Sequence, residues 1–257
     1  MNFSAIPRDR LTGKLLRLPL GLLPGDMVVP VMQGPIRGKN WIVGSGNHGC
    51  WLGSYEADKV KAFADALRGK WVVYDLGANV GYYSLIASTL LGKMGHVIAF
   101  EPDIRNISFF RRHLSMNGIN NVQIVDAAVS DQSGTAVFWQ EAGRSMGRLS
   151  DDGGVAVRTV ALDDLIRESR VPVPDVMKID VEGAEMRVLR GAQRALSELQ
   201  PLIFLATHSA TLQQESRVFL SSLGYTFVPI GSASVEINDE LIAVPRNSSA
   251  GLAHAFG

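Results

Sequence analysis

The chain has 257 residues, which fits one domain with a sizeable core better than two full domains. Hydrophobic residues make up 46% of it and charged residues 19%, an ordinary composition for a globular protein. The 25 Lys and Arg balance the 25 Asp and Glu, which argues against a protein that mainly binds nucleic-acid phosphates, and the single cysteine excludes an intrachain disulfide and a four-thiolate metal site.

Residues 1–55 are rich in Gly and Pro, with short apolar runs at 28–32 and 41–43, and we expect a small strand-rich N-terminal extension here. The apolar stretch 15–33 is interrupted by prolines, glycines and Asp26, so it lacks the roughly 20 unbroken apolar residues of a membrane span. Because no signal peptide is visible either, we expect a cytoplasmic protein without a membrane span.

Helices and strands alternate from residue 56 onward. The elements predicted first are, in chain order, a helix at 56–68, a strand at 71–76, a helix at 82–91, a strand at 96–101, a helix at 103–117 and a strand at 122–126. Strands that alternate with helices of this length indicate βαβ units and a parallel sheet.

The middle of the chain departs from this alternation. Two strand-like runs, 135–139 and 155–160, predict a hairpin with a long loop, inserted at about 134–160. The alternation then resumes with a strand at 176–179, a helix at 185–199, a strand at 202–206, a helix that ends at Gly224, and strands at 225–229 and 241–244. We therefore expect one main domain over 56–246 and a loose tail over 247–257.

Acidic or glycine-rich residues follow four of the predicted strands, namely Asp75 to Gly81, Glu101, Asp126 and Asp180. Ligands of open α/β sheets bind beyond the carboxyl ends of the strands, where the strand order reverses. Acidic side chains beside a sheet are costly to bury unless they meet donors. A shared ligand site explains this repetition better than coincidental acids in loops.

The segment DLGANVG (75–81) is the most specific of these features. Its glycines permit a close approach of the backbone to a ligand, and the helix from about Tyr82 directs free N–H groups toward it. Its G-x-x-x-G spacing, with Asn79 in the middle, differs from the G-x-G-x-x-G of dinucleotide sites. The spacing suits a smaller anion such as an amino-acid carboxylate, with Asp75 near the ammonium group. The alternative is a turn that binds nothing.

Glu101 and Asp126 are candidates for contacts with a nucleoside. A carboxylate at Glu101 can accept hydrogen bonds from both hydroxyls of a ribose, without specifying which nucleoside it is. The alternative is an ordinary helix start, with Pro102 ending the strand and Asp103 as N-cap. Asp126 beside Ala127 suits an adenine amino group above an apolar floor, or is simply an acid in a turn.

Five segments in a fixed order carry a family resemblance: DLGANVGYYS (75–84), IAFEPD (98–103), NVQIVDAAVSDQSG (121–134), TVALDDL (159–165) and KIDVEGAEMRVLRGA (178–192). Together they resemble the FkbM family of methyltransferases, from about Gly53 to Pro229, and KIDVEGAE is the most specific part. The upstream GPIRGKNW (34–41) and WLGSYE (51–56) resemble the entry segment of some members.

The resemblance implies a Rossmann-like class I methyltransferase fold, with a mostly parallel seven-stranded sheet and helices on both faces. It also implies S-adenosylmethionine as cofactor and transfer to a hydroxyl, often of a sugar or a secondary metabolite. The cofactor residues that it implies are Asp75, Gly77, Ala78, Asn79 and Gly81 at the methionine end, Glu101 and Pro102 at the ribose, Asp126 and Ala127 at the adenine, and Glu56 closing over the cofactor. One departure is Ala206, where many members carry an acidic residue.

A sugar-type hydroxyl needs a general base before it attacks the methyl group. Near the expected methyl position lie Lys178, Asp180, Glu182 and His208. We expect His208 to be the base, since its ordinary pKa lies near neutrality, with Asp180 orienting the base or the substrate. A divalent cation on Asp180 is an alternative.

Structural interpretations compete with these roles. His208 caps the next helix, Lys178 and Glu182 form a local ion pair, and Glu185, Arg187 and Arg190 form a solvated helix face. The other histidines show no metal-ligand spacing, so we assign no metal. The aromatic residues of the extension either line an acceptor pocket or belong to the core; these are Trp41, His48 and Trp51.

Three functions compete. The favoured one is methyl transfer to a small-molecule hydroxyl acceptor, without nucleic acid. The second is a methyltransferase that acts on RNA or protein; the neutral net charge speaks against RNA. The third is a nicotinamide-dependent oxidoreductase or a non-catalytic nucleotide-binding module. The glycine spacing argues against the oxidoreductase, whereas Ala206 leaves the module open. An oligomer through the extension is possible.

Overall fold

A computed structural model of the protein describes residues 20, 22–140, 147–149, 154–230 and 240–246. Part of the loop predicted within 134–160, and the whole predicted tail 247–257, lie outside the described residues. Across the described ranges, no helix has both the length and the apolar character that crossing a bilayer requires.

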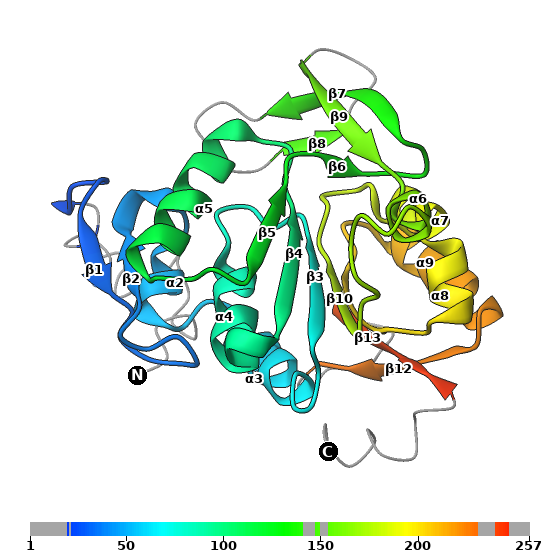
Figure 1. Ribbon diagram of the computed structural model, residues 1–257, viewed down its shortest axis with the longest axis horizontal. Helices are drawn as coiled ribbons and strands as arrows, with labels where there is room; N and C mark the ends of the chain where they lie inside the picture. The colour runs from blue at the N-terminus through cyan, green and yellow to red at the C-terminus, as the bar shows by residue number, and fades with distance from the viewer. Residues whose placement is uncertain (1–19, 21, 141–146, 150–153, 231–239, 247–257) are drawn as a thin grey trace.

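A seven-stranded sheet forms the centre of the fold (Figure 1). From one edge to the other it contains β12 (Tyr225–Pro229), β13 (Glu240–Pro245), β11 (Leu202–Ala206), β10 (Val176–Ile179), β3 (Val72–Leu76), β4 (His96–Phe100) and β5 (Val122–Val125). The strands from β11 to β5 are parallel, whereas β13 runs antiparallel to both of its neighbours. The predicted mostly parallel seven-stranded sheet is confirmed, and its strand order reverses between β3 and β10.

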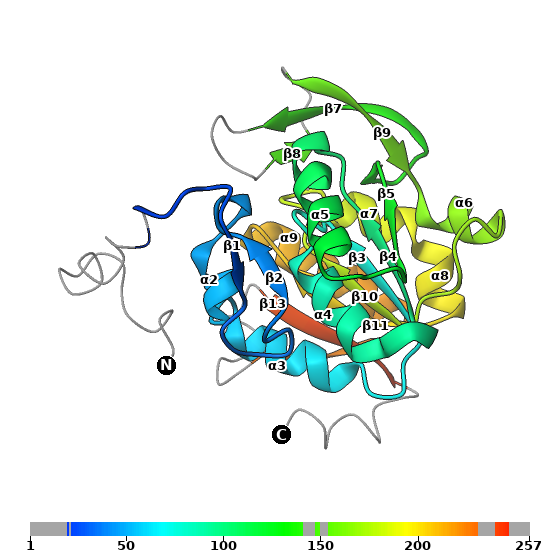
Figure 2. The ribbon, with the colours of Figure 1, turned by 60° about the vertical axis from the view of Figure 1, so that its left-hand side comes forward.

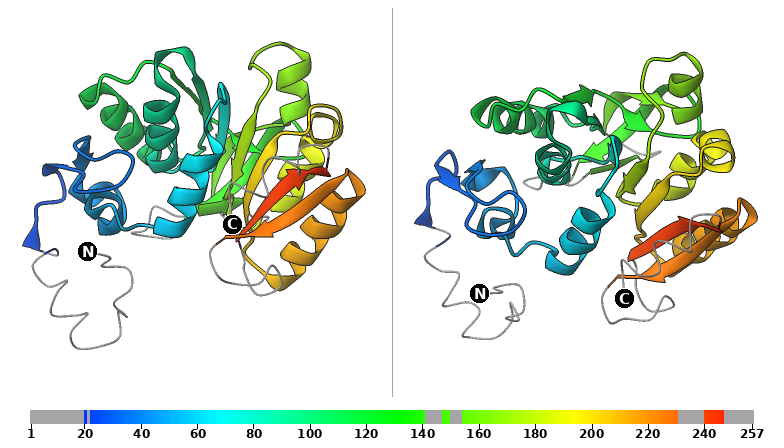
Figure 3. Two further views of the ribbon diagram at one scale, coloured as in Figure 1. Left: turned by 90° about the horizontal axis from the view of Figure 1, so that it is seen from below. Right: turned by 60° about the horizontal axis from the view of Figure 1, so that its bottom comes forward.

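Helices cover both faces of this sheet, as predicted (Figure 3). One face carries α3 (Ala57–Ala66), α4 (Tyr82–Leu91) and α5 (Ile104–Met116), and the other carries α6 (Leu162–Arg167), α7 (Glu185–Gly191), α8 (Gln193–Glu198) and α9 (Ala210–Ser222). Neighbouring residues of a strand enter different cores: Val73 packs with the first set of helices and Tyr74 with the second. Strands buried on both faces read as continuous apolar runs, which is why they were found from the sequence.

The single helix predicted after β10 is in fact two helices, α7 and α8. Gly191 ends α7 at a close contact, since a Cβ there would lie 2.0 Å from the backbone oxygen of Ser130. The carboxylate of Asp163 then accepts hydrogen bonds from two backbone N–H groups in the first turn of α8, at 2.8 and 2.9 Å. The predicted helix is therefore divided by two features: the close contact of Gly191 with Ser130, and the cap that the distant Asp163 supplies to α8.

A four-stranded sheet lies beyond the carboxyl ends of β3, β4 and β5 (Figures 1 and 2). In order it contains β6 (Ala128–Val129), β9 (Val155–Val160), β7 (Gly134–Gln140) and β8 (Gly147–Leu149). The antiparallel pair of β7 and β9 confirms the predicted hairpin, whereas β6 and β8 were not predicted. The sheet closes over the end of the main sheet at which ligands are expected.

The described part of the N-terminal region contains β1 (Val28–Pro30), β2 (Asn40–Ile42) and α2 (His48–Leu52), a helix that was not predicted. Trp41 stacks on His113 of α5, with ring centroids 4.0 Å apart. The backbone N–H of Ile42 donates to Nε2 of His113 (3.3 Å), and Nδ1 of that ring lies 2.9 Å from the backbone oxygen of Val80. His113 thus joins this region to the loop after β3. The division of the chain at residue 55 stays a prediction.

Candidate active site

A cavity of about 250 Å³ opens beyond the carboxyl ends of β3, β4 and β10, beside the point where the strand order reverses. Its wall contains the loop after β3, the end of β4, the segment after β10, parts of β6 and β7, and α2 of the N-terminal region. Open α/β sheets bind their ligands at this position.

The structure brings half of the predicted cofactor residues to this wall: Gly77, Ala78, Asn79, Glu101 and Pro102. Among the described residues, five other candidates lie off the wall: Glu56, Asp75, Gly81, Asp126 and Ala127. Asp126 is exposed and Ala127 is buried, and the next two residues, Ala128 and Val129, line the cavity instead.

The glycines of the loop after β3 are required by contacts within the protein. Gly77 has φ +78°, and a Cβ there would lie 1.9 Å from the backbone oxygen of Asp180. Gly81 has φ +89°, and its Cβ would lie 2.1 Å from the ring of Phe110. The backbone N–H of Gly77 donates to the oxygen of Phe100 at 3.0 Å. The glycines therefore permit a close approach of neighbouring segments of the protein itself, and these contacts hold the loop between β4 and β10.

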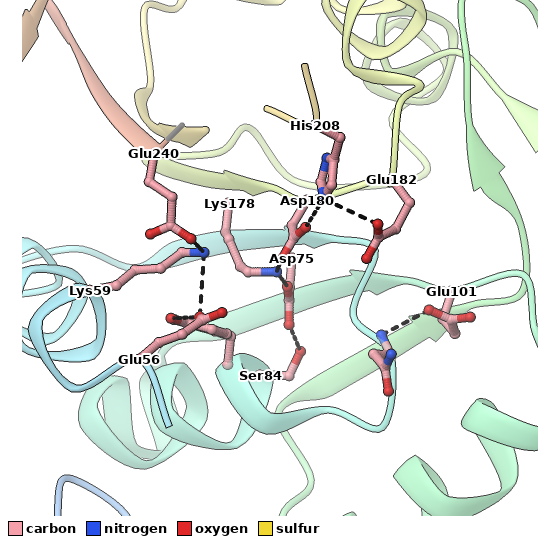
Figure 4. Close-up of polar contacts among 12 residues, drawn as sticks. Glu56, Lys59, Asp75, Ser84, Glu101, Lys178, Asp180, Glu182, His208 and Glu240 are labelled. Carbon is pink, nitrogen blue, oxygen red and sulfur yellow. Dashed lines mark hydrogen bonds and ion pairs between the residues drawn. The ribbon is translucent and has the colours of Figure 1, made fainter. Parts of the chain in front are cut away.

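Asp75 lies beneath this loop in a buried ion-pair network (Figure 4). One of its oxygens accepts a hydrogen bond from Ser84 (2.6 Å), and the other faces Nζ of Lys178 at 3.6 Å. Lys178 also donates to Asp180 (3.3 Å), so it pairs with these two carboxylates rather than with Glu182. Burial by itself lowers the pKa of Lys178, but the charges of Asp180 and Asp75 raise it above its ordinary value. Lys178 therefore remains a cation.

Glu101 is only 4% exposed and lines the cavity. Its carboxylate accepts hydrogen bonds from the backbone N–H groups of Asn79 (2.8 Å) and Asp103 (2.9 Å) and from the side chain of Asn106 (3.2 Å). Burial raises its pKa to about 7, against the opposing effect of these hydrogen bonds. Asp103 caps α5 by accepting from Arg105 N–H (2.8 Å). The predicted helix start is confirmed, and Glu101 still faces the cavity.

His208 follows β11 and faces three carboxylates. Two of them, Asp180 and Glu182, are shown in Figure 4. Its Nε2 lies 3.2 Å from Glu182 and 3.6 Å from Asp180, and its Nδ1 lies 2.6 Å from Glu185. The hydrogen bond with Glu185 is the largest influence and raises the pKa of His208, while burial opposes it. Ser209 caps α9, so the interpretation of His208 as the cap is wrong. We refer to Asp180, Glu182 and His208 as the His208 cluster.

The ligand atoms of the His208 cluster all lie within 4.8 Å of one another, an arrangement that can hold a divalent cation. Burial raises the pKa of Asp180, but the charges of Lys178, Lys59 and His208 and the hydrogen bond from Lys178 together outweigh it and bring the pKa to about 2, so this carboxylate is ionised. Burial also raises the pKa of Glu182. The sequence analysis assigned no metal, and that assignment stays a prediction.

Glu56 occupies the N-cap position of α3 with φ +46°. Its carboxylate accepts a hydrogen bond from the hydroxyl of Tyr83 (2.6 Å) and lies 3.4 Å from Nζ of Lys59. Lys59 is buried and pairs at 2.5 Å with Glu240, which lies in register opposite Ala206 on the neighbouring strand. The carboxylate of Glu56 thus lies behind the wall and contacts Tyr83, which lines the cavity.

Several residues of the site were missed by the sequence analysis. Glu185 was interpreted as part of a solvated helix face, but its side chain is fully buried. Trp41 and Trp51 belong to the core, whereas Cys50 and Tyr55 line the cavity. The resemblance of WLGSYE (51–56) to an entry segment was the signal that pointed to this part of the wall.

Comparisons with known proteins agree with the resemblance. The sequence profile of the methyltransferase FkbM domain matches residues 75–227. Hexuronic acid methyltransferase AglP of Haloferax volcanii is 29% identical over 150 residues, which are 58% of this chain and 61% of that protein. The 2-O-methyltransferase NoeI of Sinorhizobium fredii is 27% identical over 147 residues, 49% of this chain and 59% of that protein. The chain thus spans less than two thirds of either relative.

A crystal structure of methyltransferase FkbM from Methylobacillus flagellatus KT has a TM-score of 0.50 and 19% identity, over 68% of this chain and 43% of that one. This likeness concerns the fold and agrees with the predicted class I methyltransferase fold. The profile match covers more than half of the chain and includes the loop after β3, the end of β4 and the KIDVEGAE segment. The protein belongs to the methyltransferase FkbM domain family.

Proposed function

We propose that the protein is an S-adenosylmethionine-dependent O-methyltransferase that acts on a hydroxyl of a small molecule. One observation carries the proposal: a single cavity at the switch point of the sheet has both the buried Glu101 carboxylate and two residues of the His208 cluster in its wall. The first group suits a nucleoside ribose, and the cluster suits the removal of a proton. Family membership supports the same cofactor and reaction class.

The residues of the cavity fit S-adenosylmethionine, which supplies an electrophilic methyl group on a sulfonium. Glu101 with Pro102 would hold the ribose, and the apolar wall at Ala128, Val129 and Phe138 suits the adenine ring. The loop at 77–79 and the N-terminus of α4 suit the methionine carboxylate.

Other residues contribute from beyond the wall. Because Asp75 lies beneath the loop, we propose that it acts through Lys178 and Ser84. Gly81 would shape the turn into α4. Asp126 and Ala127 would border the adenine, and Glu56 would act through the hydroxyl of Tyr83.

His208 is the proposed base. His208 is not itself among the residues of the wall, but its Nε2 lies 3.2 Å from Glu182 and 3.6 Å from Asp180, which are, and we propose that it takes the proton of a bound hydroxyl. The neighbouring cations, Lys178 first among them, keep Asp180 ionised, and Asp180 would orient the hydroxyl or the imidazole. Since the pKa of His208 is raised, its neutral form grows as the pH rises. Methyl transfer should therefore increase with pH through that pKa.

The acceptor is proposed to be a hydroxyl of a sugar or of a secondary metabolite. The two relatives act, by their names, on hexuronic acid and at a 2-O position. The chain's zero net charge supports a small acceptor over RNA.

Calorimetric titration with S-adenosylmethionine and S-adenosylhomocysteine tests the cofactor, with NAD as control. We expect micromolar binding of the first two and its loss in Glu101→Ala; binding of NAD alone would contradict the proposal.

Methyl transfer is then measured with labelled S-adenosylmethionine and a panel of uronates, neutral sugars and metabolite extracts. His208→Ala should reduce transfer to a small residual rate and leave cofactor affinity unchanged, and full activity of that variant would exclude His208 as the base.

A further inference from the structure

The carboxylate of Glu185 is buried beside the proposed base, and its burial needs an explanation. The side chain lies at the start of α7 and is 0% exposed. One oxygen, Oε1, accepts a hydrogen bond from the backbone N–H of Gly183 (3.0 Å) and contacts Nδ1 of His208 (2.6 Å). The other oxygen, Oε2, is buried without a hydrogen-bond partner among the described residues. Burying a carboxylate of this kind is unfavourable unless its partners compensate for the lost hydration.

The contact with Glu185 determines where the proton of the imidazole sits. An ionised carboxylate only accepts hydrogen bonds, so Nδ1 of His208 must donate to it. Neutral imidazole has one N–H group, and with that proton on Nδ1 the lone pair is on Nε2. Nε2 also faces carboxylates, those of Glu182 (3.2 Å) and Asp180 (3.6 Å) in the cavity wall, but both distances are longer than the 2.6 Å contact at Nδ1. The neutral ring therefore keeps its proton on Nδ1, at the shorter contact, and Nε2 is the nitrogen that loses its proton. The reverse tautomer would present an N–H there and could not accept a proton.

We propose that Glu185 is a positioning residue, which holds His208 with Nδ1 protonated and Nε2 free to take the proton of the acceptor hydroxyl. The inference rests on the proposed function, because it assigns Glu185 a role through the proposed base. The proton passes from the hydroxyl oxygen to Nε2, and Nδ1 keeps its own proton, so the product is an imidazolium. The Glu185 carboxylate, in contact with Nδ1, stabilises that cation.

A purely structural role for Glu185 is the competing explanation, since Oε1 also accepts a hydrogen bond from the backbone N–H of Gly183 and thus stabilises the turn before α7. The two explanations differ in what they predict for the imidazole. If Glu185 only braces the turn, the tautomer of His208 and its titration should not depend on the charge at position 185. If it positions the base, both should change when the carboxylate becomes an amide of nearly the same shape.

The test is nitrogen NMR of protein labelled at the histidine imidazoles, recorded over pH for the wild type and for Glu185→Gln. The chain has 5 histidines, and His208→Ala assigns the relevant signal. In the wild type we expect neutral His208 to carry its proton on Nδ1. In Glu185→Gln the tautomer bias should be lost, and the midpoint of the titration should move to lower pH.

Two control variants sharpen the comparison. Glu182→Gln changes a carboxylate that faces Nε2, so it should alter the titration but leave the proton on Nδ1. Glu198→Gln changes an exposed helical carboxylate that pairs with Arg194, and His208 should titrate there as in the wild type. Thermal unfolding checks that each variant is folded. A wild-type proton on Nε2, or an unchanged tautomer and midpoint in Glu185→Gln, would overturn the inference.

Methyl-transfer rates supply a second readout. Glu185→Gln should lower kcat by about 10²-fold or more, with cofactor affinity unchanged, because loss of the orienting carboxylate disables the base. In the His208→Ala background the same change should have no further effect, since residues that act as one unit are not additive. An additive loss would refute the positioning role. The proposed function fails separately, if the wild type binds no S-adenosylmethionine or if His208→Ala remains fully active.

Discussion

Replacing Glu101 by Gln removes a carboxyl group whose proton affinity changes on folding. Its pKa rises from 4.5 to about 7 in the folded protein because it is buried. Since the folded state holds this proton more tightly, the stabilising contribution is complete below the unfolded pKa. It is lost as the pH rises through the folded pKa. At about 1.4 kcal/mol per pH unit, the group should lower the free energy of unfolding by about 3 kcal/mol between pH 4.5 and pH 8.

The glutamine side chain does not titrate. The difference in free energy of unfolding between wild type and variant, followed over pH, therefore reports the titration of Glu101 alone. At low pH we expect Glu101→Gln to be the less stable protein, because its amide cannot accept all three hydrogen bonds that the carboxyl oxygens receive from Asn79, Asp103 and Asn106. The difference should shrink by about 3 kcal/mol toward pH 8. Urea unfolding, followed by circular dichroism at several pH values, measures it. A difference that is constant over this range would refute the raised pKa.

The same group links stability to the proposed cofactor. Hydroxyl donors of a ribose favour the ionised carboxylate, so binding of S-adenosylmethionine near pH 7 should release a proton from Glu101. Calorimetry in two buffers with different ionisation enthalpies detects this release. Binding with no proton release at pH 7 would indicate that the ribose does not contact this carboxylate.

Three further perturbations test the rest of the site. Gly77→Ala should destabilise the fold by about 1–3 kcal/mol through backbone strain alone, and by more because the added methyl group would collide with the backbone oxygen of Asp180. Gly118→Ala is the control for strain, since a Cβ there meets nothing within 4 Å, and urea unfolding measures both variants. Lys178→Met leaves the carboxylates of Asp75 and Asp180 without their cation and should cost about 3–5 kcal/mol in thermal or urea unfolding. Because the proposed mechanism uses no metal, treatment with a chelator should leave methyl transfer unchanged. A loss that Mn²⁺ restores would show that a cation is needed, and the His208 cluster would be its candidate site.

Much of the candidate site was visible in the sequence because its residues are tied to strand ends. Gly77, Asn79 and Glu101 follow apolar runs whose period identifies them as buried strands, and all three line the cavity. Asp126, predicted to border the adenine, precedes Ala128, the first residue of this segment in the wall, by two positions, since the chain enters β6 there. This strand depends on pairing with β9, which is distant in the sequence.

The order of most helices and strands, the glycine loop and the acids at the strand ends could be predicted from the sequence, because apolar periodicity and turn chemistry are local properties. Which side chains meet depends on the tertiary structure. Lys178 lies in register with Asp75 because β10 pairs with β3, and His208 reaches Glu185, 23 residues away, because β11 ends beside α7. Such contacts arise from strand pairing and from helices packing on the sheet, which fix distances between residues that no local pattern relates.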